Sequence, residues 1–315
     1  MRSLLAAVAV FLSGYAAALE KVVPAGEVWR VAADEQQLHL TRLVLGDGAI
    51  VRFADGVSRW RLSAERVEIG NNVVIDGRGA AGEVGQDGAP PIPAVAAVCE
   101  SGAAGAPGGE GARGASGVAM TLDWGIAAIG SLQLLTDGGA GGAGGRGGAG
   151  QAGGELNRCR GGDGGPGGPG GRGGMGGDAG ALQLVYRPVD KRVDVAQIVS
   201  AITHSSAGGA GGSGGAGGPG GAAAEGRYMK GSIGGSKKWL AGGEPGGEGT
   251  AGAPGATGEN GRAILQLDQA GASAKSLPQR DSGARVGRQD RVSVLEERIE
   301  ALEKRLERLE QQRSH

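Results

Sequence analysis

The stretch 222–242 carries the side chains best suited to binding a partner. Its basic and aromatic residues are Arg227, Tyr228, Lys230, Lys237, Lys238 and Trp239. With Glu225, the four cations leave a local charge of +3 (4 − 1) on a chain whose formal net charge is -1. Aromatic rings supply stacking area and cations attract anionic groups. We therefore expect this stretch to bind an anionic polysaccharide or an acidic surface protein. The alternative is that Tyr228 and Trp239 pack down as a cap.

Side chains that could perform catalysis are scattered. His39, His204 and His315 lie in unrelated segments, so no Ser-His-Asp or Cys-His arrangement can be argued. Among 70 glycines, matches to Gly-x-Gly-x-x-Gly arise from composition, and no Gly-Lys-Ser/Thr loop occurs. We expect no enzymatic activity, no cofactor and no metal site. The near-neutral net charge gives no reason to expect nucleic acid as a partner.

Residues 1–18 have the features of a secretory signal peptide. Arg2 precedes an apolar stretch, and small residues lead to a cleavage site after Ala18. The apolar stretch is shorter than the roughly 20 residues that a membrane-spanning helix needs. We expect an exported protein, periplasmic, cell-surface or extracellular, with no membrane span in the mature chain.

Cys99 and Cys159 are the two cysteines of the chain, and both belong to the exported part. In an oxidising compartment an even pair forms one disulfide most simply. The two residues lack the histidine partners of a zinc site. We therefore predict a Cys99–Cys159 disulfide.

Residues 19–78 alternate between short apolar stretches and turns. Asp47-Gly48 and Asp55-Gly56 are turn signals on either side of the strand-like stretch 50–53. Short strands at close spacing predict a β-solenoid-like domain, in which each coil adds a strand to a parallel sheet. A small β-sandwich would give a similar pattern and stays an alternative.

From residue 79 onward, glycine recurs at every third residue in six runs. The runs are 79–88, 102–117, 138–153, 162–180, 208–220 and 243–261. A strand-like stretch precedes each odd-numbered run and follows each even-numbered one, so the order strand, run, loop, run, strand occurs three times. We predict one glycine-rich domain with interleaved β-strands over 79–269.

A period of three matches the left-handed polyproline-type helix, in which every third residue lies on the same edge. Such a helix has no internal hydrogen bonds, and glycine on one edge lets a neighbouring backbone supply them. We therefore predict three antiparallel hairpins of polyglycine II helices. The alternatives are a flexible linker, because glycine loses the most entropy on ordering, and collagen. Short, interrupted runs with little proline disfavour collagen.

The triplets, such as Gly147-Gly148-Ala149, resemble the polyglycine-II bundles of springtail antifreeze proteins and of glycine-rich tip adhesins on phage tail fibres, alongside collagen-like Gly-X-Y runs. The resemblance covers 79–261 and implies stacked layers of extended helices; in the tip adhesins, the loops that join the helices contact the receptor. It includes no binding motif, so no functional residue is carried over. Ice binding, which the antifreeze resemblance suggests, is disfavoured because Arg and Asp interrupt the Ala faces.

The C-terminal region is predicted to be a linker over 270–289 followed by a coiled coil over 290–312. Its apolar seam, at alternating spacings of three and four, consists of Val292, Leu295, Ile299, Leu302, Leu306 and Leu309. The Arg/Glu register and an Arg-apolar-x-x-apolar-Glu pattern favour a parallel homotrimer. Val292 and Ile299 at the a positions with leucine at d would instead favour a dimer. A lone amphipathic helix docked on its own domain is the remaining alternative.

Together these features predict a mainly β/irregular, exported structural or adhesin-like protein. Its rigid glycine-rich bundle would present distal loops that bind a surface, a glycan or a protein. A purely structural component of a matrix or coat is the alternative, and an ice-binding protein is the third candidate.

The predicted seam implies that the mass of the particle depends on the tail. We expect sedimentation equilibrium to give the full chain three times the mass of a version that ends before residue 290. A twofold ratio would correct the stoichiometry to a dimer, and equal masses would contradict the coiled coil.

Overall fold

The computed structural model describes residues 19–230 and 237–268. Its contacts divide the chain into two units, Met1–Gln269 and Ala270–His315. The predicted signal peptide, linker and coiled-coil seam lie outside the described residues.

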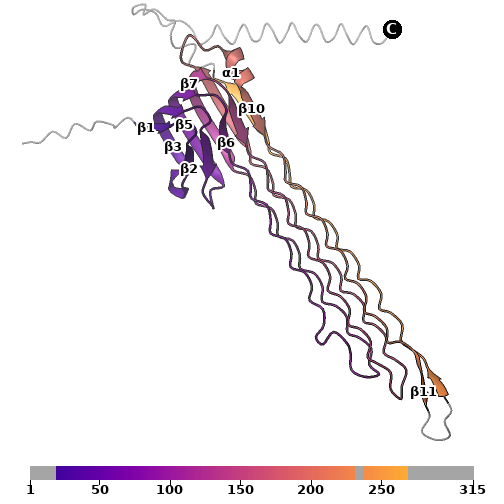
Figure 1. Cartoon of the computed structure of the whole chain (residues 1–315). Helices are drawn as coiled ribbons and strands as arrows, with labels where there is room; N and C mark the ends of the chain where they lie inside the picture. The colour runs from indigo at the N-terminus through magenta and orange to yellow at the C-terminus, as the bar shows by residue number, and fades with distance from the viewer. Residues whose placement is uncertain (1–18, 231–236, 269–315) are drawn as a thin grey trace, which may run out of the picture. The chain divides into compact units, whose positions relative to one another are not determined.

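Two parallel β-sheets form one end of the first unit (Figure 1). The six-stranded sheet contains, in order, β1 (Glu20–Val23), β3 (Gln37–Leu45), β5 (Arg59–Ile69), β7 (Ala119–Ile129), β9 (Leu182–Pro188) and β13 (Ala263–Leu267). The five-stranded sheet contains β10 (Ile202–Ser205), β8 (Leu132–Leu135), β6 (Val73–Asp76), β4 (Ile50–Phe53) and β2 (Val28–Val31). Successive strands alternate between the sheets from β1 to β10, so each coil of the chain adds one strand to each sheet.

The strands form because alternate side chains can be buried between the two sheets. In β5, the buried positions include Trp60, Leu62 and Ala64, while Arg59 and Arg61 point to solvent. Trp60 and Trp124 are among the largest fully buried side chains. A register shift between Ala64 and Val67, where β5 pairs with β7, restores the alternation after two exposed residues.

Two short helical elements accompany the sheets, namely the 3-10 helix η1 (Ala33–Glu35) and the α-helix α1 (Val195–Ala201). The side chain of Asp194 caps α1 by accepting a hydrogen bond from the backbone N–H of Gln197 at 2.7 Å. Ile198 is the residue of α1 that is buried against the core.

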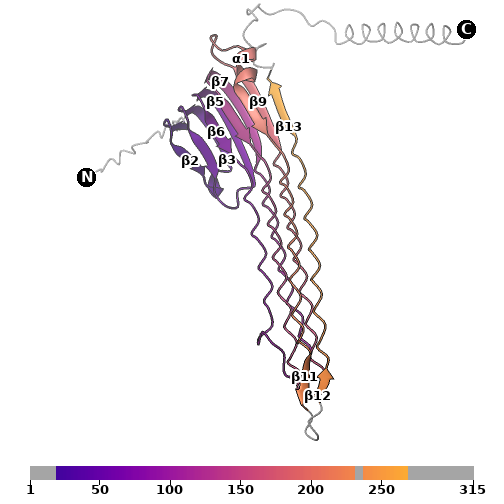
Figure 2. The same cartoon turned by 45° about the vertical axis from the view of Figure 1, so that its right-hand side comes forward.

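Six glycine segments extend from the sheets, as Figures 1 and 2 show. We number them segment 1 (79–88), segment 2 (102–117), segment 3 (138–153), segment 4 (162–180), segment 5 (208–221) and segment 6 (243–261). Segments 1, 3 and 5 follow the strands β6, β8 and β10, and segments 2, 4 and 6 precede β7, β9 and β13. The odd-numbered and the even-numbered segments therefore run in opposite directions.

Backbone hydrogen bonds at every third residue join each segment to its neighbours. Gly82 N–H donates to Ala140 O at 2.8 Å, from segment 1 to the parallel segment 3. Gly142 N–H donates to Ala112 O at 2.9 Å, from segment 3 to the oppositely directed segment 2. The segments thus form a lattice of two layers, one with the odd-numbered and one with the even-numbered members.

The register of the strands continues into the lattice. At the start of β6, Val73 N–H donates to Ser131 O, a span of 58 residues (131 − 73), and the bond from Gly82 to Ala140 also spans 58 (140 − 82). The parallel pairing of strands thus continues without slippage along segments 1 and 3. The sheets align the segments that leave them.

The predicted fold class is wrong. We expected solenoid-like strands in 19–78 and three hairpins of polyglycine II helices beyond them. The described residues instead form mainly parallel β-structure, in two sheets of six and five strands that draw on both regions, with a single α-helix. The glycine segments contain no helical element, and their backbone hydrogen bonds run to neighbouring segments rather than within one segment. The predicted coiled-coil helix lies outside the described residues.

Glycine is required where a segment faces another backbone. A Cβ added at the buried Gly145 would lie 2.0 Å from Gln86 O, which is closer than real Cβ atoms come to any atom. At the exposed Gly247, an added Cβ meets nothing within 4 Å. The triplet period therefore reflects close packing of backbones, and glycine is not needed at Gly247, which lies outside the triplet series of segment 6.

These two glycines provide a matched test of the lattice. We expect Gly145→Ala to lower the free energy of unfolding by about 1–3 kcal/mol or more, because the carbonyl of Gln86 must move. Gly247→Ala should leave it unchanged or raise it by about 0.4–1 kcal/mol, because alanine restricts the unfolded chain. Denaturant unfolding followed by circular dichroism measures both. Equal midpoints for the two variants would show that the segments are not closely packed.

Candidate binding site at the β11–β12 hairpin

The basic and aromatic residues that the sequence singled out lie on a two-stranded antiparallel sheet, β11 (Arg227–Lys230) and β12 (Lys237–Leu240). It stands at the end of the lattice that is remote from the two large sheets (Figure 2). In its register, Tyr228 faces Trp239 and Lys230 faces Lys237. All six predicted site residues are therefore brought together.

Because side chains alternate between the faces of a sheet, the hairpin has two different faces. Tyr228, Trp239, Lys230 and Lys237 share one face, which we call the aromatic face. The other face carries Arg227, Met229, Lys238 and Leu240.

An aromatic pair forms the centre of the aromatic face. The rings of Tyr228 and Trp239 meet edge to face, with centroids 4.9 Å apart and planes at 61°. Tyr228 is nevertheless 67% exposed and Trp239 53% exposed. Such exposure of two large rings argues against their packing down as a cap, and it leaves ring surface available to a partner.

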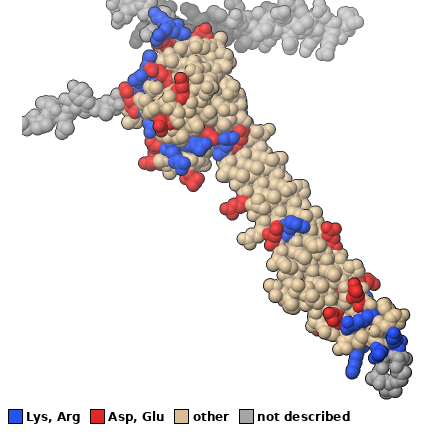
Figure 3. Space-filling model, in the orientation of Figure 1, with Lys and Arg blue, Asp and Glu red and all other residues tan. Residues whose placement is uncertain are grey.

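Positive charge surrounds this pair. Lys230 and Lys237 are exposed and lie directly opposite each other, an arrangement that destabilises a sheet. Among the described residues, neither of them nor Lys238 forms a salt bridge. Figure 3 shows Lys and Arg side chains gathered at this end of the unit. An anionic group bound between the two ammonium groups would relieve their repulsion.

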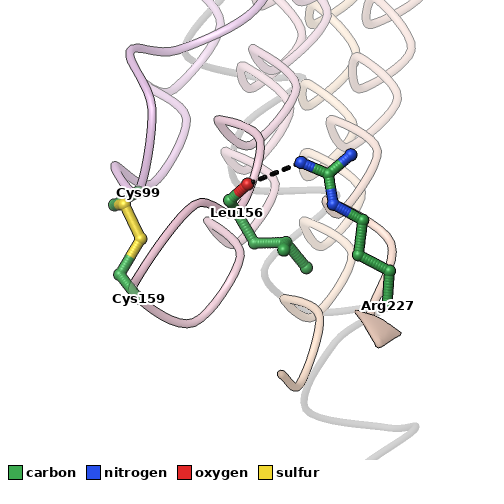
Figure 4. Close-up of a disulfide and its surroundings, with 4 residues drawn as sticks. All are labelled: Cys99, Leu156, Cys159 and Arg227. Atoms are coloured by element: carbon green, nitrogen blue, oxygen red, sulfur yellow. Dashed lines mark hydrogen bonds between the residues drawn. A yellow bond between two sulfur atoms is a disulfide. The ribbon is translucent and has the colours of Figure 1, made fainter. Parts of the chain in front are cut away.

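The opposite face ties the hairpin to the lattice. Arg227 Nη2 donates to the backbone oxygen of Leu156 at 2.9 Å (Figure 4), and the side chain of Leu156 is buried. Met229 and Leu240 are partly buried on the same face. Arg227, which the sequence suggested as a binding residue, thus has a structural contact. No sequence signal identifies Leu156, because its contribution is a backbone carbonyl.

A second arginine supports the base of the hairpin. Arg160 Nη2 forms a salt bridge with Asp163 at 2.8 Å, and Arg160 Nε donates to Gly242 O at 3.1 Å. The loop between segments 3 and 4 therefore contacts the chain just after β12. Sequence reasoning missed this residue, since its partner is far away in the chain.

The predicted disulfide is confirmed. Cys99 and Cys159 are bonded, with their Cα atoms 5.9 Å apart (Figure 4). The bond joins the loop between segments 1 and 2 to the loop between segments 3 and 4, beside Leu156. Cys99 has φ 71°, a left-handed conformation that is uncommon outside glycine.

His39, Ser63 and Asp123 lie side by side on the six-stranded sheet, but not in the order that a hydrolytic triad needs. Ser63 is hydrogen-bonded to His39 Nδ1 and pairs in register with Asp123 on its other side. Asp123 accepts a hydrogen bond from Arg187 at 2.9 Å. A catalytic triad needs the carboxylate to orient the histidine, and here the serine stands between them.

The described residues offer neither a metal-binding cluster nor a membrane-spanning helix. No cluster of His, Cys, Asp and Glu within 19–230 and 237–268 is able to hold a metal ion. In that same part of the chain, no helix has the length and apolar character needed to cross a membrane.

No protein-family model and no curated protein matches the chain. A solved structure that does match is the springtail antifreeze protein from Granisotoma rainieri, a bundle of nine polyproline type II helices studied for crystal waters that match the ice lattice. The match is 25% identical, covers 57% of this chain and 94% of that one, and has a TM-score of 0.13. So low a score carries no argument about fold or function. The likeness to tail-fibre adhesins stays a prediction.

The disulfide closes a loop with a sequence separation of 60 residues. We expect Cys99→Ala/Cys159→Ala to lower the free energy of unfolding by about 2–4 kcal/mol, because the unfolded chain regains the freedom of that loop. Denaturant unfolding of the two proteins, each with and without a thiol reductant, measures this loss.

Reductant should lower the midpoint of the native protein to that of the variant and leave the variant unchanged. A native midpoint that does not respond to complete reduction would show that the bond adds no stability.

Proposed function

We propose that this is an exported presentation protein whose glycine lattice holds the β11–β12 hairpin against an anionic polysaccharide. An acidic surface protein is the other partner that the same charges would suit. The observation that carries the proposal is the exposed Tyr228–Trp239 pair flanked by Lys230 and Lys237 on one face.

The lattice suits presentation because it resists bending. Each inner segment is hydrogen-bonded to neighbours on several sides, so bending would break many bonds at once. The disulfide and the Arg227–Leu156 bond hold the far end together, where the described residues form no large apolar core. A binding hairpin mounted there stays in a defined position relative to the lattice.

The aromatic face suits a charged sugar polymer. Ring surfaces of Tyr228 and Trp239 would stack on the apolar faces of sugar rings, while Lys230 and Lys237 would meet carboxylate or sulfate groups. Attraction between exposed charges weakens as salt screens it. Binding should therefore weaken at high ionic strength without disappearing, because stacking does not depend on salt.

Neighbouring lysines on opposite faces of β12 supply a sharp test. We expect Lys237→Ser to weaken binding to an immobilised polyuronate about tenfold, because its ammonium group lies beside the aromatic pair. Lys238→Ser removes the same charge from the other face and should weaken binding less than threefold. Trp239→Ser should abolish binding. Biolayer interferometry at two salt concentrations measures all four proteins, including the native one.

The melting temperature serves as the control for folding in each variant. Equal affinity for Lys237→Ser and Lys238→Ser would mean that charge alone, and no defined face, attracts the polymer. Undiminished binding by Trp239→Ser, or no binding by the native protein, would reject the site and favour the purely structural role.

A further inference from the structure

One lateral edge of the glycine lattice has hydrogen-bond donors without acceptors. It belongs to segment 5, where Gly211, Gly214, Gly217 and Gly220 are only partly exposed. Within the described residues, no acceptor is recorded for the N–H group of any of the four. We call this row, together with the adjoining side of segment 6, the open edge.

The corresponding donors of segments 1 to 4 are all used. In segment 3, Gly141 N–H donates to Ala210 O at 2.8 Å and Gly147 N–H to Ala216 O at 2.9 Å, both in segment 5. In segment 4, Gly167 N–H donates to Gly247 O of segment 6 at 2.9 Å. The open edge therefore has the donors of a repeating pattern but lacks the next segment.

One donor at the start of this row does have an acceptor. Gly208, the first glycine of the row, donates its N–H to the side-chain oxygen Oδ1 of Asn260 at 2.9 Å. Asn260 belongs to segment 6, on the same side of the lattice. The side chains at the equivalent positions beside the four glycines that follow, those of Thr257, Pro254, Ala251 and Glu248, accept no hydrogen bond from them.

The apolar core also ends uncovered on this side. β13 is the last strand of the six-stranded sheet, and its Leu265 and Leu267 are in register with Leu184 and Tyr186 of β9. Leu184 and Tyr186 are buried, whereas Leu265 and Leu267 are partly exposed. β10 ends the other sheet on the same side. The lattice and both sheets thus terminate together.

We infer that the open edge is the surface by which two copies of this chain associate. Carbonyl groups at every third residue of an extended backbone match the spacing of these donors, as the carbonyls of segment 5 match the donors of segment 3. Segment 6 has carbonyl groups at this spacing, those of Glu248, Ala251 and Pro254. They accept no hydrogen bond from the described residues, as is also true of the equivalent carbonyls inside the lattice, such as those of Gly167 and Gly170. An edge with a donor row beside an acceptor row is complementary to itself.

The arrangement of the two copies follows from steric limits. Simple side-by-side repetition would place segment 1 of one copy next to segment 5 of the other. That arrangement is sterically blocked, because β4 and β2 continue the five-stranded sheet beyond β6, the strand that segment 1 follows. A twofold axis along the segments avoids this clash. It sets segment 5 opposite the partner's segment 6 and brings β10 beside the partner's β13, and such an isologous contact closes as a dimer.

Two alanines of segment 6 allow this surface to be tested. Ala251 is exposed on the open edge. Ala253, two residues later, is also exposed, but its carbonyl accepts the N–H of Gly173 in segment 4, on the side away from the open edge. Ala251→Arg places a bulky charge in the contact, and Ala253→Arg places the same side chain outside it.

The experiment follows amide hydrogen exchange of the full-length chain by NMR, because predicted association through the tail would affect mass alone. In concentrated native protein and Ala253→Arg, we expect at least tenfold slower exchange at Gly211, Gly214 and Gly217 than in Ala251→Arg. Dilution of the native protein should remove this protection. The buried Gly212 and Gly215, whose N–H groups are bonded to segment 4, should stay protected in every sample.

Three outcomes would overturn the inference. Fast exchange of the edge glycines in concentrated native protein would show that no copy binds there. Protection that persists on dilution would show that the chain covers its own edge. Equal protection in Ala251→Arg and Ala253→Arg would place any contact between copies elsewhere.

Discussion

The hydrogen bond from a glycine N–H to a carbonyl of the adjacent segment, repeated at every third residue, is the interaction on which this unit depends. An extended chain without internal hydrogen bonds must satisfy its polar groups with neighbours or water. Here the neighbours approach so closely that an added Cβ at Gly171 would lie 1.8 Å from Gly109 O. The bonds and the absence of side chains are therefore two aspects of one constraint.

This lattice needs the sheets, because backbone hydrogen bonding alone leaves ordered glycine with a large entropic cost. Apolar burial between the sheets, around Trp60, Trp124 and Leu122, supplies the driving force that the segments lack. The sheets also set the register. Where β8 and β10 end, the bond from Thr136 N–H to Ser205 O spans 69 residues (205 − 136), and the bond from Gly138 to Ala207 spans the same 69 (207 − 138). The pairing of β8 with β10 thus aligns the hydrogen bonds between segments 3 and 5, which follow these strands.

The two surfaces proposed to bind a partner differ in which part of the chain makes the contacts. At the hairpin, side chains provide the chemistry, since Tyr228, Trp239 and the facing lysines stand clear of the lattice. On the open edge, the backbone itself provides it, because the glycines of segment 5 have no side chain to offer. The first surface suits a charged polymer, and the second suits only a chain with the same triplet spacing.

The sequence by itself determined the local features. The triplet period located every glycine segment, the paired cysteines predicted the disulfide that is present, and the basic and aromatic residues of 227–239 identified the groups that the hairpin brings together. Each of these depends on residue type and spacing along the chain, which the sequence states directly.

Only the tertiary structure decided how these parts combine. It joined strands from 19–78 and from beyond residue 79 in the same two parallel sheets, because each repeat leaves an edge that the next repeat covers. The period of three could not distinguish helical hairpins from extended segments bonded to their neighbours, since both place glycine at a contact. The Leu156 carbonyl that holds Arg227, and the unfilled donors of segment 5, belong to backbone atoms. Every residue carries such atoms, so only their positions in space reveal which are used.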